Sequence, residues 1–366
     1  MKILLLGEYS NLHWTLAQGL RHLGHEVTVA SDGSRWMDNI RDIDLARNGY
    51  GVLPTIKYIY KILKNKNKFR NYDIVQLINP IFLDLKAEKN LTFYRFLRKH
   101  NKRVFLGAYG VDYFWIKTCL DKETFRYSDY YIGDRPNLFP TREQHRKEWM
   151  VAPKKDLNLE IVDTCDGVIA CLYEYYVSYL KDYPDKITYI PAPINTRELK
   201  FRQREIPEVV NFFIGIQKER SQLKGTDIIY KVLQEVHEKY PDKSSIKKAQ
   251  SVPYEKYVSL MNDSEIILDQ LYSYTPGMNA LSAMAQGLVA VSGGEPEAYE
   301  ILNEYENRPI VNVLPDENDI FNKLEKLILE KEAIPGLSVK SRQFIEQHHD
   351  YVKVAQQYLD FWTRNL

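Results

Sequence analysis

Short apolar runs alternate with helical patterns along this 366-residue chain, and the series starts again in the second half. The first run, residues 2–7, is followed by a polar loop, a helical pattern over residues 14–23 and a second strand pattern over residues 25–30. A second series begins at residues 209–215. Apolar strands separated by helices are typical of parallel sheets covered on both faces. The sequence therefore predicts two doubly wound α/β domains joined near residue 195.

Three segments are harder to assign. Residues 245–251 stand where a strand is expected, but they are polar. Residues 120–150 are polar, aromatic and irregular, as in an insertion. Residues 339–362 have the pattern of one amphipathic helix, on which the pair His348-His349 is most simply a surface feature.

The stretch from residue 264 to residue 302 has a layout that suits an anion. A buried strand pattern runs into a loop with Pro276 and Gly277, and a helix of small residues, 278–286, follows. The first N–H groups of a helix have no partner inside it, and its dipole is positive there, so a diphosphate is a natural ligand. The alternative is an ordinary strand-to-helix turn in which Gly277 serves the bend.

Composition excludes several classes of protein. The net charge of +1 offers no argument for nucleic-acid binding. Cys119, Cys165 and Cys171 form no CxxC pair, which favours a reducing compartment without disulfides or a zinc site. No secretory segment and no apolar run long enough for a membrane span is visible. We expect a cytoplasmic protein.

Residues 56–70 form a basic helical pattern in which lysines alternate with isoleucine, leucine and tyrosine. Such a helix can lie on anionic lipid, so residues 57–70 are a candidate for peripheral contact with the inner face of a membrane. The alternative is a surface helix whose lysine stems cover apolar neighbours.

Several motifs, in order along the chain, resemble those of one family. Residues 214–227 hold an Ile-Gly strand end, an arginine and a Lys-Gly-Thr-Asp turn, similar to a strand followed by R…KG(T/M)D. Residues 277–287 resemble G-x-x-x-L-E-A-M-A-x-G, residues 293–297 resemble GGxPE, and residues 189–195 resemble an IPNPID linker. On these motifs the chain resembles the GT-B glycosyltransferases, specifically the retaining, family-4-like group.

The resemblance implies an α/β fold with two Rossmann-like domains facing a central cleft. Residues 1–195 would bind the acceptor, residues 196–340 would bind a nucleotide sugar, and residues 341–366 would form a helix that returns to the first domain. It also implies sugar transfer with retention and without a metal or other cofactor, since the nucleotide sugar is a substrate. By analogy the product is a surface polysaccharide or glycolipid, and the acceptor a carbohydrate or lipid-linked sugar.

The resemblance also assigns roles to individual residues. Arg220 and Lys224 would stabilise the departing diphosphate, with Lys218 as a substitute. Asp112 would face the reacting sugar or acceptor, although an Asx turn after Gly110 is an equally good interpretation. The donor-binding candidates are Gln250, Val252, Asp269, Tyr274, Gly277, Met278, Asn279, Ser282 and Glu295.

The chain departs from the family pattern at three places. Tyr274 and Ser282 stand where the family often has a pair of glutamates, and Asp269 or Glu295 could compensate. Tyr109 stands where a histidine commonly follows the strand. Tyr109, Asn11 and His13 are the acceptor-binding candidates, although a lone histidine after a strand is more often a capping or packing group.

Two other functions stay open. A non-catalytic protein of the same fold would bind a nucleotide or partner, and the missing acidic pair favours this. A nucleotide-sugar epimerase would bind the donor and need no acceptor.

Overall fold

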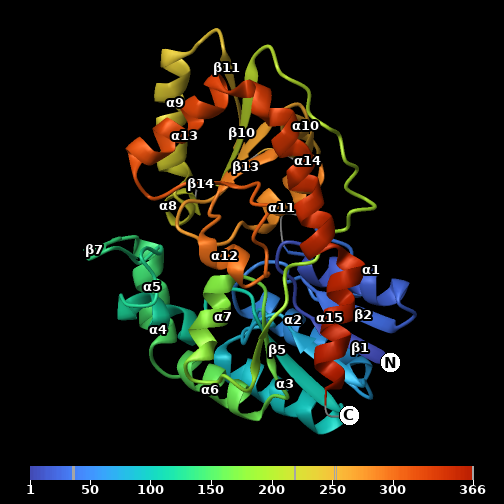
Figure 1. Ribbon diagram of the computed structural model, residues 1–366. Helices are drawn as coiled ribbons and strands as arrows, with labels where there is room; N and C mark the ends of the chain where they lie inside the picture. Colours follow the sequence, from blue (N-terminus) through green and yellow to red (C-terminus); the bar gives the residue numbers. More distant parts are fainter. Residues whose placement is uncertain (35–37, 218–219, 251, 253, 365–366) are drawn as a thin grey trace. The chain divides into compact units, whose positions relative to one another are not determined.

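The computed structural model describes residues 1–34, 38–217, 220–250, 252 and 254–364 (Figure 1). It divides into two compact units. Unit 1 comprises Met1–Lys117, Gln144–Pro193 and the chain from Tyr351 onward, and unit 2 comprises Thr118–Glu143 and Ile194–Asp350. Residues 118–143 therefore lie with unit 2, whereas the sequence interpretation had given all of residues 1–195 to the first domain.

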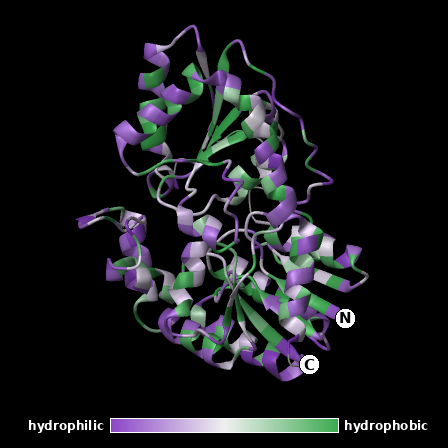
Figure 2. Ribbon diagram, in the orientation of Figure 1, coloured by the Kyte–Doolittle hydropathy of each residue, from purple (hydrophilic) through white to green (hydrophobic). Residues whose placement is uncertain are grey.

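Unit 1 is built on a seven-stranded parallel sheet in the order β3-β2-β1-β4-β5-β8-β9. The strands are β1 (Lys2–Leu6), β2 (Glu26–Ser31), β3 (Ile43–Asp44), β4 (Ile74–Leu77), β5 (Arg103–Ala108), β8 (Val168–Ala170) and β9 (Ile187–Tyr189). Ile3 to Leu6 are fully buried, as expected for a central parallel strand, and the strands are largely hydrophobic in Figure 2.

The helices of the first part of the chain connect these strands, and the last helix packs beside the first. They are α1 (Leu12–His22), α2 (Val52–Asn65), α3 (Ala87–His100), α4 (Tyr113–Asp121), α5 (Pro140–Trp149), α6 (Lys154–Thr164), α7 (Tyr173–Leu180) and α15 (Tyr351–Thr363), with a 3-10 turn at Lys66–Phe69. Gly19 of α1 permits the close approach of α15, because a Cβ there would lie 2.2 Å from the Tyr351 carbonyl oxygen.

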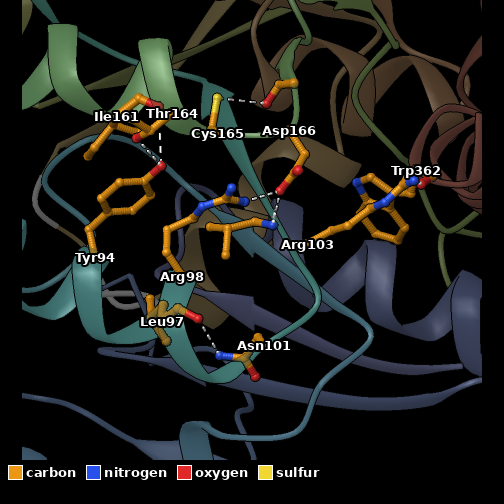
Figure 3. A network of polar contacts seen from close by, with 12 residues as sticks. Tyr94, Leu97, Arg98, Asn101, Arg103, Ile161, Thr164, Cys165, Asp166 and Trp362 are labelled. Atoms are coloured by element: carbon orange, nitrogen blue, oxygen red, sulfur yellow. Dashed lines mark hydrogen bonds and ion pairs between the residues drawn. The ribbon is translucent and has the colours of Figure 1, made fainter. Parts of the chain in front are cut away.

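A polar network also holds α15 to unit 1 (Figure 3). Arg103 on β5 donates to the Trp362 carbonyl oxygen at 2.9 Å. On the neighbouring α6–β8 connection, Asp166 accepts from the Val104 backbone N–H at 2.7 Å and from Arg98. The expected return of the C-terminal helix to the first domain is thus confirmed.

Unit 2 has a five-stranded parallel sheet in the order β11-β10-β12-β13-β14. Its strands are β10 (Val210–Ile216), β11 (Ser244–Gln250), β12 (Ile266–Leu268), β13 (Val289–Ser292) and β14 (Val311–Asn312). Its helices are α8 (Ser221–Lys224), α9 (Thr226–Lys239), α10 (Tyr254–Asn262), α11 (Met278–Ala285), α12 (Pro296–Glu300), α13 (Glu317–Leu329) and α14 (Ile334–Phe344), with a 3-10 turn at Lys331–Ala333 and a π-helix at Ile345–His349. The polar strand is real, and its polarity follows from its place at the edge of the sheet.

Two sequence expectations are wrong at the C-terminus. The single helix over residues 339–362 is instead interrupted at Asp350, where the chain passes from unit 2 to unit 1. His349 is buried, and His348 lies 2.7 Å from the buried carboxylate of Glu304, so neither is a surface feature. The partner of His348 is distant in sequence, which is why spacing alone does not reveal this contact.

The segment 118–143 contains a small antiparallel ribbon, β6 (Tyr131–Ile132) paired with β7 (Arg135–Pro136). We call residues 118–143 the strap, because they belong to unit 2 although they are far in sequence from the rest of that unit. No helix within the described ranges is long and apolar enough to cross a bilayer. The same residues hold no group of three or more His, Cys, Asp or Glu that could bind a metal ion.

Candidate functional site

The sheet of unit 2 has a switch point between β10 and β12, because the next strand after β10 lies on one side of this pair and the next strand after β12 lies on the other. In open parallel sheets ligands bind at the carboxyl ends of the strands at such a point. Arg220 and Lys224 follow β10, while Asp269 and Gly277 follow β12. Sequence prediction and topology therefore select the same edge of unit 2.

The turn from Arg220 to Gly225 is fixed by close packing. Gly225 has a φ of 69°, and a Cβ there would lie 2.6 Å from Cβ of Leu271. The Leu271 backbone N–H donates to the Lys224 carbonyl oxygen at 2.8 Å. A glycine is thus needed at position 225, and it presses the end of α8 against the loop after β12.

Lys224 is paired with Asp269. Its Nζ lies 3.2 Å from Oδ1 of Asp269, and the Asp269 side chain is only 2% exposed. The other oxygen, Oδ2, has no hydrogen-bond partner within the described part of the chain. A Cβ at Gly277 would lie 2.8 Å from that Oδ2, so the carboxylate points toward the start of α11. A buried lone pair without a donor leaves room for a hydroxyl or amide of a ligand.

The start of α11 is open to an anion. Gly277 is the N-cap in extended conformation, no side chain caps the helix, and its first turn holds no acidic residue. Met278 is half-buried and Asn279 is exposed. Ser282 is half-buried one turn further, on the same face as Met278. The free N–H groups and the helix dipole favour negative charge here.

The remaining predicted donor residues occupy other places. Gln250 ends β11 and pairs in register with Ile216, so it lies at the same carboxyl edge. Val252 is half-buried just beyond it. Lys218 lies outside the described residues.

Glu295 and Tyr274 contact the strap, which the sequence interpretation did not foresee. The Glu295 carboxylate accepts from Arg126 at 2.8 Å, from the Tyr127 hydroxyl at 2.6 Å and from Asn312 at 3.0 Å. The Tyr274 hydroxyl accepts from the Arg126 backbone N–H at 2.7 Å. Both side chains are buried, so their polar atoms hold residues 126–127 in place.

Charge reinforces this attachment. Arg126 also pairs with Glu297, and this hydrogen bond lowers the pKa of the Glu297 carboxyl. The Arg126 guanidinium stacks 4.8 Å from the centroid of the Tyr274 ring. Burial raises the pKa of Tyr274 to about 12, so its hydroxyl stays neutral.

The strap also reaches the neighbourhood of Arg220. Asp129 forms a buried ion pair with Arg142. Burial raises the pKa of Asp129, while Arg142 and, more weakly, Arg220 lower it. Beside α8 the surface is hollowed into an open pocket of about 450 Å³, lined by Phe139, Pro140, Thr141, Ser221, Gln222, Leu223 and Asp227. The strap thus forms one wall beside the predicted phosphate site.

Unit 1 has its own switch point between β1 and β4, and the loop after β1 holds two acceptor candidates. Asn11 is half-buried in left-handed conformation with a φ of 67° and precedes α1. His13 is fully buried, its Nδ1 lies 2.8 Å from the Gly7 carbonyl oxygen, and its Nε2 has no partner among the described residues. Burial lowers the pKa of His13 to about 4, so the ring is neutral.

Glu8 in the same loop was not selected from the sequence. Its carboxylate accepts from the backbone N–H groups of His13 at 3.1 Å and Trp14 at 2.9 Å, and burial raises its pKa to about 8. An acidic residue directly after a buried central strand is the feature that would have marked it.

Tyr109 is a packing residue in this structure. It is buried, its hydroxyl lies 2.5 Å from that of Tyr358 on α15, and its ring is edge-on to His13 at 6.3 Å. A contact with an acceptor through its hydroxyl would have to compete with Tyr358.

Asp112 has both carboxylate oxygens engaged by unit 1. Oδ1 accepts from the Trp115 backbone N–H at 2.9 Å, and Oδ2 accepts from the Tyr179 hydroxyl at 2.5 Å. Asn158 donates to the same hydroxyl at 3.2 Å. This is the geometry of a helix cap at the start of α4, a local backbone role like that of the Asx turn that the sequence offered as the alternative for Asp112.

We expect Asp112→Ala to lower the free energy of unfolding by about 2–4 kcal/mol, because it removes a cap and leaves the Tyr179 hydroxyl with one partner fewer.

Burial raises the pKa of Asp112 from 3.8 to about 6. The folded protein therefore binds the proton more tightly, and this residue's contribution to stability falls as pH rises from about 4 through about 6. Asp112→Asn should remove that fall. Denaturant unfolding of the three proteins between pH 4 and pH 8 tests this, and equal stability of wild type and Asp112→Ala would contradict it.

Comparison with known proteins shows which family model and which solved structures the chain resembles. Residues 216–360 match the family model described as glycosyl transferase-like. WaaG, a glycosyltransferase of lipopolysaccharide biosynthesis, aligns over 99% of this chain and 100% of its own with a TM-score of 0.62 at 13% identity. HepE of Anabaena, solved with UDP and glucose, aligns over 98% of both chains with a TM-score of 0.58 at 12% identity.

The chain has the GT-B glycosyltransferase fold. This confirms the resemblance to the GT-B glycosyltransferases at the level of the fold, and the family match covers the stretch that carries most of the motifs. The fold also occurs in a UDP-GlcNAc 2-epimerase of Neisseria meningitidis, which aligns over 98% of this chain and 99% of its own with a TM-score of 0.53 at 12% identity. A search among curated proteins found no match.

Proposed function

We propose that this chain is a retaining glycosyltransferase that moves a sugar from a nucleotide sugar to a hydroxyl of a carbohydrate or lipid-linked acceptor. The observation that carries the proposal is the arrangement at the switch point of unit 2. There Lys224 and the uncapped start of α11 lie on either side of Asp269, within the glycosyl transferase-like stretch. A cation and free N–H groups together suit a diphosphate leaving group.

In the proposed reaction the acceptor oxygen bonds to the anomeric carbon on the face from which the diphosphate leaves. The bond between that carbon and the diphosphate oxygen breaks, and the leaving oxygen takes the acceptor proton. Lys224 and Arg220 would offset the charge that develops on the diphosphate, and the N–H groups of α11 would bind it. The unpartnered oxygen of Asp269 would accept a hydrogen bond from the donor. No cofactor or metal enters this scheme.

Related structures support the choice of substrate and pathway. HepE is solved with UDP and glucose, and WaaG acts in lipopolysaccharide biosynthesis. We extend these to a nucleotide-sugar donor and a surface polysaccharide or glycolipid product by analogy of fold. A cytoplasmic location suits the three free and buried cysteines.

Two observations favour other functions. The strap engages the polar groups of Tyr274 and Glu295, and Asp269 offsets the charge of Lys224, which suits a protein that binds a nucleotide without transfer. The shared fold with a UDP-GlcNAc 2-epimerase suits an isomerisation of the donor itself.

Thermal unfolding with a panel of nucleoside diphosphates and nucleotide sugars is the first test. A ligand at 100 times its dissociation constant should stabilise the folded protein by about 2.7 kcal/mol. We expect the nucleotides that carry one particular base to stabilise the protein. Because the proposed site uses no metal, this stabilisation should persist in the presence of EDTA. Unchanged stability with every nucleotide would contradict the proposed donor site.

A further inference from the structure

Helix α2 turns an apolar stripe toward solvent. Val52, Leu53, Ile56, Tyr60 and Leu63 have exposed fractions of 76%, 71%, 57%, 66% and 58%. At about 100° per residue these five positions fall within about 100° of the helix circumference. A surface helix normally turns such a stripe toward the core, so this outward face needs an explanation. We call these five residues the α2 face.

The orientation of α2 is fixed by its opposite side. Tyr58 and Ile62 are buried in unit 1, and the Asp84 backbone N–H donates to the Tyr58 hydroxyl at 3.2 Å. Arg47 donates to the Thr55 hydroxyl at 2.5 Å and to the Asp84 carbonyl oxygen at 3.2 Å. Unit 1 therefore uses the other side of this helix and leaves the α2 face outside.

Basic charge surrounds the α2 face. Residues 45–72 contain seven lysines and arginines and no acidic residue, although the whole chain carries a net charge of only +1. Lys57, Lys64 and Lys68 are exposed and form no ion pair with any residue that the structure describes, whereas Lys61 pairs with Asp44. Helical spacing puts Lys57 and Lys64 along one edge of the stripe.

We propose that the α2 face docks on the surface of an anionic lipid bilayer. Its aliphatic side chains would enter the boundary between head groups and acyl chains, while the flanking lysines meet the lipid phosphates. Tyr60 and the exposed Tyr50 suit the membrane–water interface, because a tyrosine ring is apolar and its hydroxyl can stay hydrated.

Charge argues against a second copy of the chain as the occupant. A two-fold contact would place the same surface on both sides, so two segments with seven basic residues each would face one another. An anionic bilayer complements both the apolar stripe and the charge. This proposal does not rest on the proposed transfer reaction.

Co-sedimentation of the full chain with vesicles tests the proposal. We expect binding to vesicles of phosphatidylcholine with about 30% phosphatidylglycerol, weak binding to pure phosphatidylcholine, and loss of binding at high salt. Lys57→Glu with Lys64→Glu should weaken binding at least about tenfold, since each basic residue near an anionic surface contributes about fivefold. Leu53→Glu with Leu63→Glu should weaken it to a similar degree. Exposed residues of unit 2 provide matched controls, Lys200→Glu with Lys340→Glu for charge and Leu329→Glu for the apolar change.

An environment-sensitive label distinguishes docking through α2 from other attachment. The native cysteines are buried, so Leu63→Cys can be labelled selectively, with Leu329→Cys as the control position. Anionic vesicles should shift the emission of the label at position 63 to the blue and leave that at position 329 unchanged. Folded wild type that fails to bind anionic vesicles would overturn the proposal, as would equal binding by the α2 variants and their controls. Concentration-dependent dimerisation that Leu53→Glu with Leu63→Glu abolishes, without vesicle binding, would assign the face to a second copy instead.

Discussion

Lys224→Ala is expected to lower the rate of sugar transfer by at least about 100-fold. Removal of one group that stabilises developing charge typically costs a factor of 10²–10³. The ammonium of Lys224 stands beside the uncapped start of α11, held there by the Gly225 turn and by Asp269. Initial rates with the donor identified by thermal unfolding measure the effect.

The pairing with Asp269 complicates a single substitution, because Lys224→Ala leaves a buried carboxylate without its cation. We expect that variant to lose stability as well as activity. Adding Asp269→Asn should restore much of the melting temperature and leave transfer impaired. Lys231→Ala on α9 removes an exposed ion pair with Glu317 on α13 and should change neither quantity. Wild-type transfer by folded Lys224→Ala would contradict the assigned role.

Glu295→Ala is expected to lower the free energy of unfolding of the protein by about 3–5 kcal/mol and to loosen the strap. The substitution removes a buried carboxylate that accepts hydrogen bonds from Arg126, Tyr127 and Asn312. The buried Tyr127 hydroxyl then loses the acceptor of its hydrogen bond. Denaturant unfolding measures the loss. Limited trypsin digestion should cut sooner after Arg126, which lies within the strap and is followed by Tyr127.

Two further variants, one at Glu295 itself and one on the following helix α12, sharpen this test. Glu295→Gln keeps the shape of the side chain and one acceptor oxygen, so it should lose less stability than Glu295→Ala. Glu300→Ala changes an exposed carboxylate on α12 and should have little effect. If Glu295→Ala proves as stable and as resistant to trypsin as Glu300→Ala, the strap is not held by Glu295.

The fold could be predicted from the sequence because its central strands are parallel and buried on both faces. Ile3 to Leu6 and Ile266 to Leu268 are such strands, and they appear as continuous apolar runs that no amphipathic surface element produces. The edge strand β11 lacks this pattern, and its position had to come from the spacing between helices.

The strap and the contact of His348 could not be predicted in the same way. The bonds from Arg126 to Glu295 and Glu297 join residues 169 and 171 positions apart, and His348 meets Glu304 at a separation of 44. The motifs indicate where Tyr274 and Glu295 lie in the fold. The sequence around them does not indicate that a distant segment forms hydrogen bonds with their side chains.

The most direct test of the proposed function is product analysis by mass spectrometry and NMR. Each nucleotide sugar would be incubated with wild type, with and without a panel of hydroxyl acceptors from monosaccharides to lipid-linked sugars. We predict a glycosylated acceptor that keeps the anomeric configuration of the donor, with one nucleoside diphosphate released per sugar transferred. Recovery of the donor as its epimer without any acceptor would contradict this account, as would recovery of a tightly bound donor unchanged under every condition.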